Sequence, residues 1–123
     1  MTPREAVEAL KSRHNRLQEL SQSNIKQSHI MRGIMAELHA QAIGIALLEG
    51  QTPDKPSGYT LEDALHYLER RRVHLATKVL GNTDVQYTSR VKCGLEREAI
   101  LLAESAVKAE IGREMVCSMR DVV

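Results

Sequence analysis

The residues whose types and spacing could support metal chemistry are five histidines and one acid–histidine pair. No two histidines are three or four residues apart, so no helix can present two of them to one metal ion. Asp63 and His66 have the spacing found in carboxylate-bridged di-iron bundles, but that site needs a second such pair and two further glutamates. The sequence supplies no second pair. We therefore predict no metal site and no cofactor.

Nucleophilic catalysis has equally little support. Cys93 lies among basic residues that could lower the pKa of its thiol, but the sequence shows no base placed to activate it. A cysteine on an apolar helix stripe is usually part of the core. Glycine-rich phosphate loops are missing from the sequence. An enzyme that uses Asp63, His66 and His74 is therefore the last of our functional hypotheses.

A local excess of positive charge is the strongest remaining signal. Residues 70–97 contain seven basic and two acidic side chains, whereas the net charge of the whole chain is only +1. A globally basic nucleic-acid binder is disfavoured by that balance. We hypothesise an anion site whose tyrosines could stack on a base. It comprises Tyr67, Arg70, Arg71, His74, Lys78, Tyr87, Arg90, Lys92 and Arg97. The alternative is a solvated face whose arginines pair with neighbouring acids.

These basic residues must be positioned by a helix over residues 61–80. Thr60 and Asp63 have the spacing of a capping box at its start, and Gly81 is a normal helix stop. An apolar stripe runs along one side, and Arg70, His74 and Lys78 share the opposite side. Successive helical residues point about 100° apart, so the Arg70–Arg72 triplet cannot form one patch.

Arg72 interrupts the apolar stripe of this helix. A charge in such a position turns toward solvent, pairs with a buried acid or faces an interface. Glu98 interrupts the main apolar stripe of the last helix in a similar way. We therefore predict an ion pair between Arg72 and Glu98, either within one chain or between two chains.

The rest of the sequence predicts an all-α fold, either a four-helix bundle or two helical hairpins. A single domain is expected, with a helical hairpin over residues 3–49, a Pro/Gly loop over 50–59 and a second hairpin over 60–119. The first helix begins after Thr2, and a turn over residues 21–24 is favoured over one continuous helix, with the second helix beginning near Ile25. Because the chain has no Phe or Trp, the core must consist of aliphatic side chains, which suits packed helices.

Homo-oligomerisation is expected because the second and fourth helices each have two apolar faces. Ala36, Ala40 and Gly44 form a ridge of small residues, which we predict to be the closest contact in the oligomer. Cys93 and Cys117 are expected on one helix, roughly 36 Å apart, so they should be reduced thiols. No signal peptide or membrane span is visible. A cytoplasmic protein is therefore predicted.

The leading hypothesis for function is a small non-enzymatic binding protein that presents basic pockets to an anionic ligand. That ligand is either a nucleotide-type small molecule or a nucleic-acid backbone. The alternative is a protein-interaction module, meaning an adaptor or inhibitor that occludes a partner protein. Small chains without motifs are common among phage and mobile-element accessory proteins, which is compatible with this alternative.

Overall fold

The computed structural model describes residues 1–24, 26–81 and 84–121, with only the backbone of Leu80 and of residues 118–121. The predicted all-helical fold is confirmed: four helices pack together, and no strand occurs in the described ranges. The helices are α1 (Pro3–Ser21), α2 (Ser28–Leu48), α3 (Leu61–His74) and α4 (Tyr87–Asp121). A π-helix, η1 (Leu75–Leu80), continues α3.

The starts of α1 and α3 are fixed by complete capping boxes. Thr2 accepts a hydrogen bond from the backbone N–H of Glu5, and the Glu5 carboxylate accepts one from the Thr2 N–H. Thr60 and Asp63 repeat this arrangement at α3. In each case two backbone donors at the helix end are satisfied reciprocally. The sequence predictions for both helix starts are therefore confirmed.

The start of α2 differs from the prediction. The expected boundary, Ile25, lies outside the described residues, and the helix begins at Ser28 with Gln27 as its N-cap. Gln27 makes no side-chain capping bond, and the first turn of α2 has no acidic residue. The backbone donors of this turn thus keep a partial positive charge that no side chain of α2 offsets.

The π-helix η1 changes which residues share a face. The backbone N–H of Gly81 donates to the carbonyl oxygen of Ala76, five residues earlier, at 3.1 Å. A π-turn is wider than an α-turn. The four-residue spacing that would align Lys78 with His74 therefore no longer holds, and Lys78 is an exposed residue of η1.

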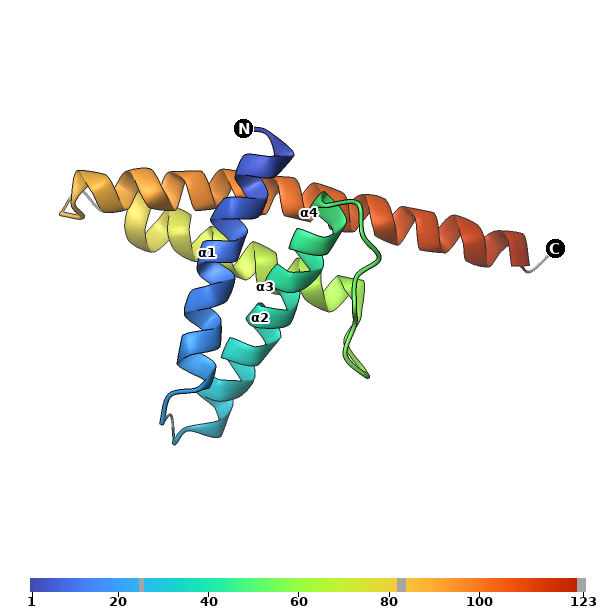
Figure 1. The fold of residues 1–123 in the computed structure, drawn as a ribbon, viewed down its shortest axis with the longest axis horizontal. Helices are drawn as coiled ribbons and strands as arrows, with labels where there is room; N and C mark the ends of the chain where they lie inside the picture. The colour runs from blue at the N-terminus through green and yellow to red at the C-terminus, as the bar shows by residue number, and fades with distance from the viewer. Residues whose placement is uncertain (25, 82–83, 122–123) are drawn as a thin grey trace.

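The four helices form two hairpins that cross each other (Figure 1). The α1–α2 hairpin packs against the pair formed by α3 and α4, and its tip projects away from that pair. α4 is the longest helix, and its C-terminal part extends beyond the other three helices. The core lies where the hairpins cross. It includes Leu10, Ile43, Leu61, Leu68, Leu75, Ile100 and Val107.

The ridge of small residues on α2 is used inside the chain. Ala40 and Gly44 are buried, and a Cβ atom placed on Gly44 would lie 3.0 Å from the Cβ of Ala103 on α4. Ala36 is partly buried, and its carbonyl oxygen accepts a hydrogen bond from the Tyr59 hydroxyl at 2.7 Å. Small residues do permit a close helix approach here. Gly44 of this ridge therefore packs against α4 of the same chain, and the role of the ridge in an oligomer contact stays a prediction.

No helix within the described ranges is long and apolar enough to cross a membrane.

Candidate functional site

A cleft of about 430 Å³ lies between the α1–α2 hairpin and α3. Its volume falls in the range of small-molecule sites, which is roughly 300–1,000 Å³. Residues from three helices surround it. The described lining residues are Arg13, Leu17, Leu20, His29, Ile30, Gly33, Ile34, Glu37, Tyr67, Arg70, Arg71 and His74.

The α3 side of the cleft is cationic. Arg70 and His74 are four residues apart and therefore lie one helical turn from each other. Both side chains are exposed, and neither has an ion pair or side-chain hydrogen bond within the described part of the chain. Arg70 thus brings an unpaired positive charge to this wall. His74 adds a ring N–H donor to the same wall.

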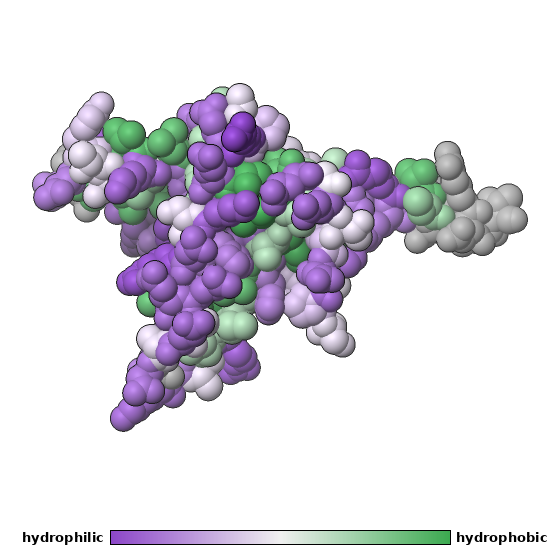
Figure 2. All heavy atoms as spheres, viewed as in Figure 1, coloured by the Kyte–Doolittle hydropathy of each residue, from purple (hydrophilic) through white to green (hydrophobic). Residues whose placement is uncertain are grey.

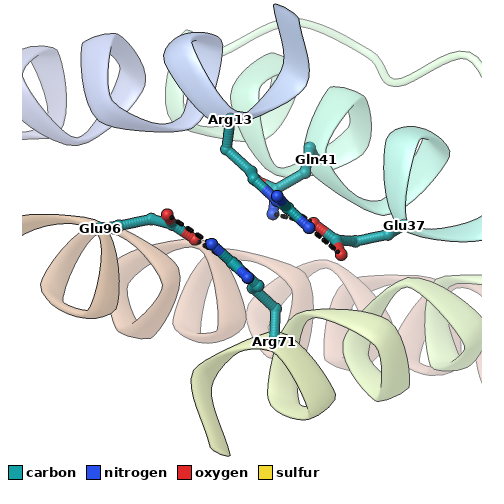
Figure 3. A network of polar contacts seen from close by, with 5 residues as sticks. All are labelled: Arg13, Glu37, Gln41, Arg71 and Glu96. Carbon is teal, nitrogen blue, oxygen red and sulfur yellow. Dashed lines mark hydrogen bonds and ion pairs between the residues drawn. The ribbon is translucent and has the colours of Figure 1, made fainter. Parts of the chain in front are cut away.

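Two further arginines line the cleft, and each is matched by a glutamate (Figure 3). Arg13 of α1 forms a bidentate pair with Glu37 of α2, with donor–acceptor distances of 2.7 and 2.9 Å. Arg71 of α3 forms a second bidentate pair with Glu96 of α4, at 2.7 and 3.1 Å. The two pairs face each other, so all four helices meet at this point. Their charges cancel, and they anchor the walls rather than add net charge.

The electrostatics of Arg71 agree with a structural role. Burial by itself lowers the pKa of the Arg71 guanidinium, but the hydrogen bonds that Arg71 donates to Glu96 and the charges of Glu96 and Glu37 outweigh it. The pKa therefore ends above its ordinary value. Beside this pair, the Gln41 Nε2 atom donates to Glu37 at 3.4 Å. The buried Gln41 Oε1 atom has no hydrogen-bond partner among the described residues.

Apolar side chains also line the cleft, and they come from α1 and α2. Leu17 and Leu20 contribute from α1, and Ile30 and Ile34 from α2. Gly33 lies between the two isoleucines, and a Cβ atom built on it would meet no atom within 4 Å. The α1–α2 side of the cleft therefore combines these apolar side chains with His29 and the Arg13–Glu37 pair, whereas the α3 side presents Arg70 and His74.

The structure brings only part of the predicted anion site together. Tyr67, Arg70, Arg71 and His74 line the cleft, although Arg71 is neutralised by Glu96. Five other predicted residues are not among its described lining residues. They are Lys78, Tyr87, Arg90, Lys92 and Arg97. Lys78, Tyr87, Arg90 and Lys92 are exposed, and Arg97 is half-buried.

The predicted partner of Arg72 is also corrected. Within the chain, Arg72 pairs with Glu104 rather than with Glu98, and Glu98 is exposed. Glu104 is six residues further along α4 and is almost fully buried. The prediction that Arg72 points into the packed side of α3 therefore agrees with the structure, whereas the partner within the chain was wrong.

Sequence reasoning missed the α1–α2 contribution to the cleft. Arg13, His29 and Glu37 were not among the predicted site residues, nor was Gly33. A signal for part of this contribution was present in α2. Glu37 and Gln41 are four residues apart on one side of an otherwise apolar helix, which places both groups on a face that must find polar partners.

Metal ligands do not gather in the parts of the chain that the structure describes, where no group of three His, Cys, Asp or Glu side chains is close enough to hold an ion. Asp63 instead accepts the capping bond from the Thr60 N–H at 2.9 Å. The His66 ring lies edge-on to the ring of Tyr67, with 5.1 Å between the ring centroids.

The fold and the cleft define an all-helical protein of two crossed hairpins with a cation-lined cleft between them. Comparison with known proteins adds no family to this description. No protein-family model matches the chain, and neither a curated protein nor a solved structure matches it.

Proposed function

We propose that this chain is a small binding protein rather than an enzyme, and that it holds an anionic ligand in the cleft at Arg70 and His74. One observation carries the proposal. Of the three arginines that line the cleft, Arg13 and Arg71 each have a bidentate carboxylate partner within the chain, whereas Arg70 has no such partner among the described residues. A bound anionic ligand can serve as the partner of Arg70.

The chemistry of the unpaired groups suits a phosphate or a carboxylate. A guanidinium group presents parallel N–H donors that match two oxygens of such an anion. His74 supplies a further donor from the next turn of the same helix. His29 lines the cleft from the first turn of α2, the helix start without an acidic side chain. The helix dipole at this end adds to the attraction for negative charge.

Of the two ligand classes expected from the sequence, the small molecule is favoured over the nucleic-acid backbone. A backbone ligand needs several unpaired cations along an open surface. Lys78 and Lys92 are not among the described lining residues, and of those residues Arg70, His29 and His74 are the basic groups without a carboxylate partner. This charge is suited to one anionic group.

The test compares Arg70→Gln with Arg32→Gln. Arg32 is an exposed arginine on α2 that does not line the cleft, so its loss removes the same charge elsewhere. Orthophosphate, AMP and a single-stranded oligonucleotide serve as probes. A ligand at ten times its Kd should stabilise the native protein and the Arg32→Gln variant by about 1.4 kcal/mol. Arg70→Gln should lose most of this effect.

The salt dependence separates the two ligand classes in the same experiment. Binding of one small anion should weaken only modestly between low and high salt, whereas a backbone that contacts several cations loses affinity steeply. The proposal fails if none of the three probes raises the melting temperature, or if Arg70→Gln and Arg32→Gln respond alike.

A second candidate function is a protein-interaction module, and the exposed face of α4 favours it. Figure 2 shows apolar surface toward both ends of α4. Exposed large apolar side chains of this helix are Val91, Leu95, Leu101, Met115 and Val116. Exposed apolar surface of this kind is typical of contact sites. Self-association through α4 is the simplest use of it.

Sedimentation velocity of the native protein and of Leu95→Glu tests this second proposal. Self-association through α4 predicts a concentration-dependent sedimentation coefficient that Leu95→Glu abolishes. A monomer at all micromolar concentrations, with no partner protein retained on purification, would remove the support for this function.

A further inference from the structure

We infer that the ligand of the cleft is an amphipathic anion, with one phosphate or carboxylate group on a hydrocarbon body that lies over Gly33. This inference rests on the proposed anion site and adds the chemistry of the rest of the ligand. It is carried by the apolar side chains that α1 and α2 bring to the cleft opposite Arg70 and His74 of α3.

The apolar side chains of the cleft are partly open to solvent. Ile30 is 42% exposed, although it is a large aliphatic side chain. Ile34 and Leu20 are partly exposed beside it, and Leu17 is buried beneath the surface of the cleft. Orthophosphate alone would leave this apolar surface in water. A hydrocarbon body would cover it and gain the corresponding transfer free energy.

Gly33 leaves open space beside the α2 backbone. It lies in the interior of α2, where glycine is less favourable than alanine. On the same helix, the close approach of Ala103 accounts for the glycine at position 44. At Gly33, by contrast, nothing in the described structure lies within 4 Å of a Cβ atom placed there. The space that a side chain would take on Gly33 belongs to the cleft. A ligand body can therefore approach the α2 backbone closely at this position.

The charges that line the cleft suit a single anionic group. Arg13 and Arg71 are neutralised by Glu37 and Glu96, so Arg70 is the unmatched arginine among the described lining residues, and His29 and His74 also line the cleft. One anionic head group satisfies this charge. A polyanion would bring negative charge close to Glu37, which also lines the cleft.

The chain length of the ligand tests the inference. The probes are n-alkyl phosphates from ethyl to octyl and n-alkanoates of the same lengths, below their micelle concentrations, with orthophosphate as the head group alone. Affinity should rise with each methylene by up to roughly fourfold until the apolar side chains of the cleft are covered. The two probe series distinguish a phosphate head group from a carboxylate.

Two variants locate the two parts of the ligand. Arg70→Gln should weaken every probe by a similar factor, roughly tenfold or more. Gly33→Leu should remove the gain in affinity from longer chains, because its side chain occupies the space of the ligand body. Gly112→Leu is the matched control, since a Cβ on this exposed glycine of α4 also meets no atom within 4 Å. Both leucine variants should melt no lower than the native protein.

The outcomes separate this inference from the proposed function. Binding that depends on Arg70 but not on chain length overturns the inference and leaves the anion site standing. A chain-length effect that survives Gly33→Leu also overturns it, because the hydrocarbon then binds elsewhere. No binding of any probe overturns the anion site and the inference together.

Discussion

The Arg72 guanidinium lies against the carboxylate of Glu104, with Nε 2.7 Å from Oε2 and Nη2 3.2 Å from Oε1. The two members differ in exposure: the Arg72 side chain is 25% exposed, whereas that of Glu104 is 4% exposed. The hydrogen bonds to Glu104 are the main reason why the pKa of Arg72 is raised. This pair joins α3 to the middle of α4.

The difference in exposure predicts unequal costs of removing either partner. Arg72→Met leaves a buried carboxylate without its cation and should lower the free energy of unfolding by about 3 kcal/mol. Glu104→Leu should cost less, about 1–2 kcal/mol, because Arg72 can turn toward water. The Arg72→Met/Glu104→Leu double variant should be more stable than the sum of the two losses predicts. Urea denaturation of the four proteins gives these values.

Glu98 provides the control for this cycle. It is exposed on the same helix, so Glu98→Gln should change stability by no more than about 0.5 kcal/mol. Additive losses in the Arg72/Glu104 cycle, or coupling of Arg72 to Glu98 instead, would contradict the observed pairing.

A glycine-to-alanine substitution on α2 should have opposite effects on stability at Gly33 and at Gly44. Gly44→Ala places a Cβ atom 3.0 Å from the Cβ of Ala103, so α2 and α4 must separate. We expect a loss of about 1–3 kcal/mol from overpacking. Gly33→Ala meets no atom and should gain about 0.5–1 kcal/mol from helix propensity. Thermal melts of both variants decide the matter, and equal changes would contradict the close α2–α4 approach.

The buried side chain of Gln41 should be replaceable by an apolar side chain of similar volume at little cost in stability. Its Oε1 atom has no partner in the described structure, and its Nε2 makes one long bond of 3.4 Å to Glu37. Gln41→Met keeps the volume and removes the unsatisfied acceptor. Stability should change by less than about 1 kcal/mol or rise, whereas Gln41→Ala should lose about 2 kcal/mol through its cavity. A large loss in the methionine variant would show that the amide is essential.

We expect His14 to make the folded protein less stable at acidic pH. Burial, and then the nearby charge of His39, lower the pKa of His14 below its ordinary value of 6.5. The unfolded chain therefore takes up this proton at a higher pH than the folded chain does. The stabilisation is present above the unfolded pKa and is lost as the pH falls below it toward the folded pKa.

The measurement is urea denaturation as a function of pH for the native protein and His14→Gln. The native protein should lose stability below the ordinary histidine pKa with a contribution of at most about 1.4 kcal/mol per pH unit from this one group. His14→Gln should show a shallower decline. Parallel curves would mean that other groups carry the acid sensitivity.

Local sequence signals predicted the features that depend on neighbouring residues. Thr60 and Asp63 predicted the start of α3 because a capping box is complete within four residues. The apolar stripe placed Arg72 on the packed side of this helix. The partner of Arg72 depends on how α4 is aligned along α3, and a shift of six residues along α4 separates Glu98 from Glu104. Helix spacing alone does not contain that alignment.

The cleft was predicted only on its α3 side for the same reason. Arg70 and His74 are one turn apart in sequence, whereas Gly33 and Ile30 reach the site through the crossing of the two hairpins. The π-helix was not predicted, because its residues also suit an α-helix, and it removed Lys78 from the expected face. Gly44 was recognised as part of a close contact, but sequence could not tell a neighbouring helix of the same chain from that of a second copy.

The most direct test of the cleft as an anion site is an amide chemical-shift titration of the ¹⁵N-labelled protein with n-hexyl phosphate, repeated on Arg70→Gln. The account predicts saturable shifts that concentrate in three segments, residues 17–20 of α1, 29–34 of α2 and 67–74 of α3, which together line the cleft. Arg70→Gln should require a roughly tenfold higher concentration. Shifts that concentrate instead over residues 87–97 of α4, or that Arg70→Gln leaves unchanged, would contradict it.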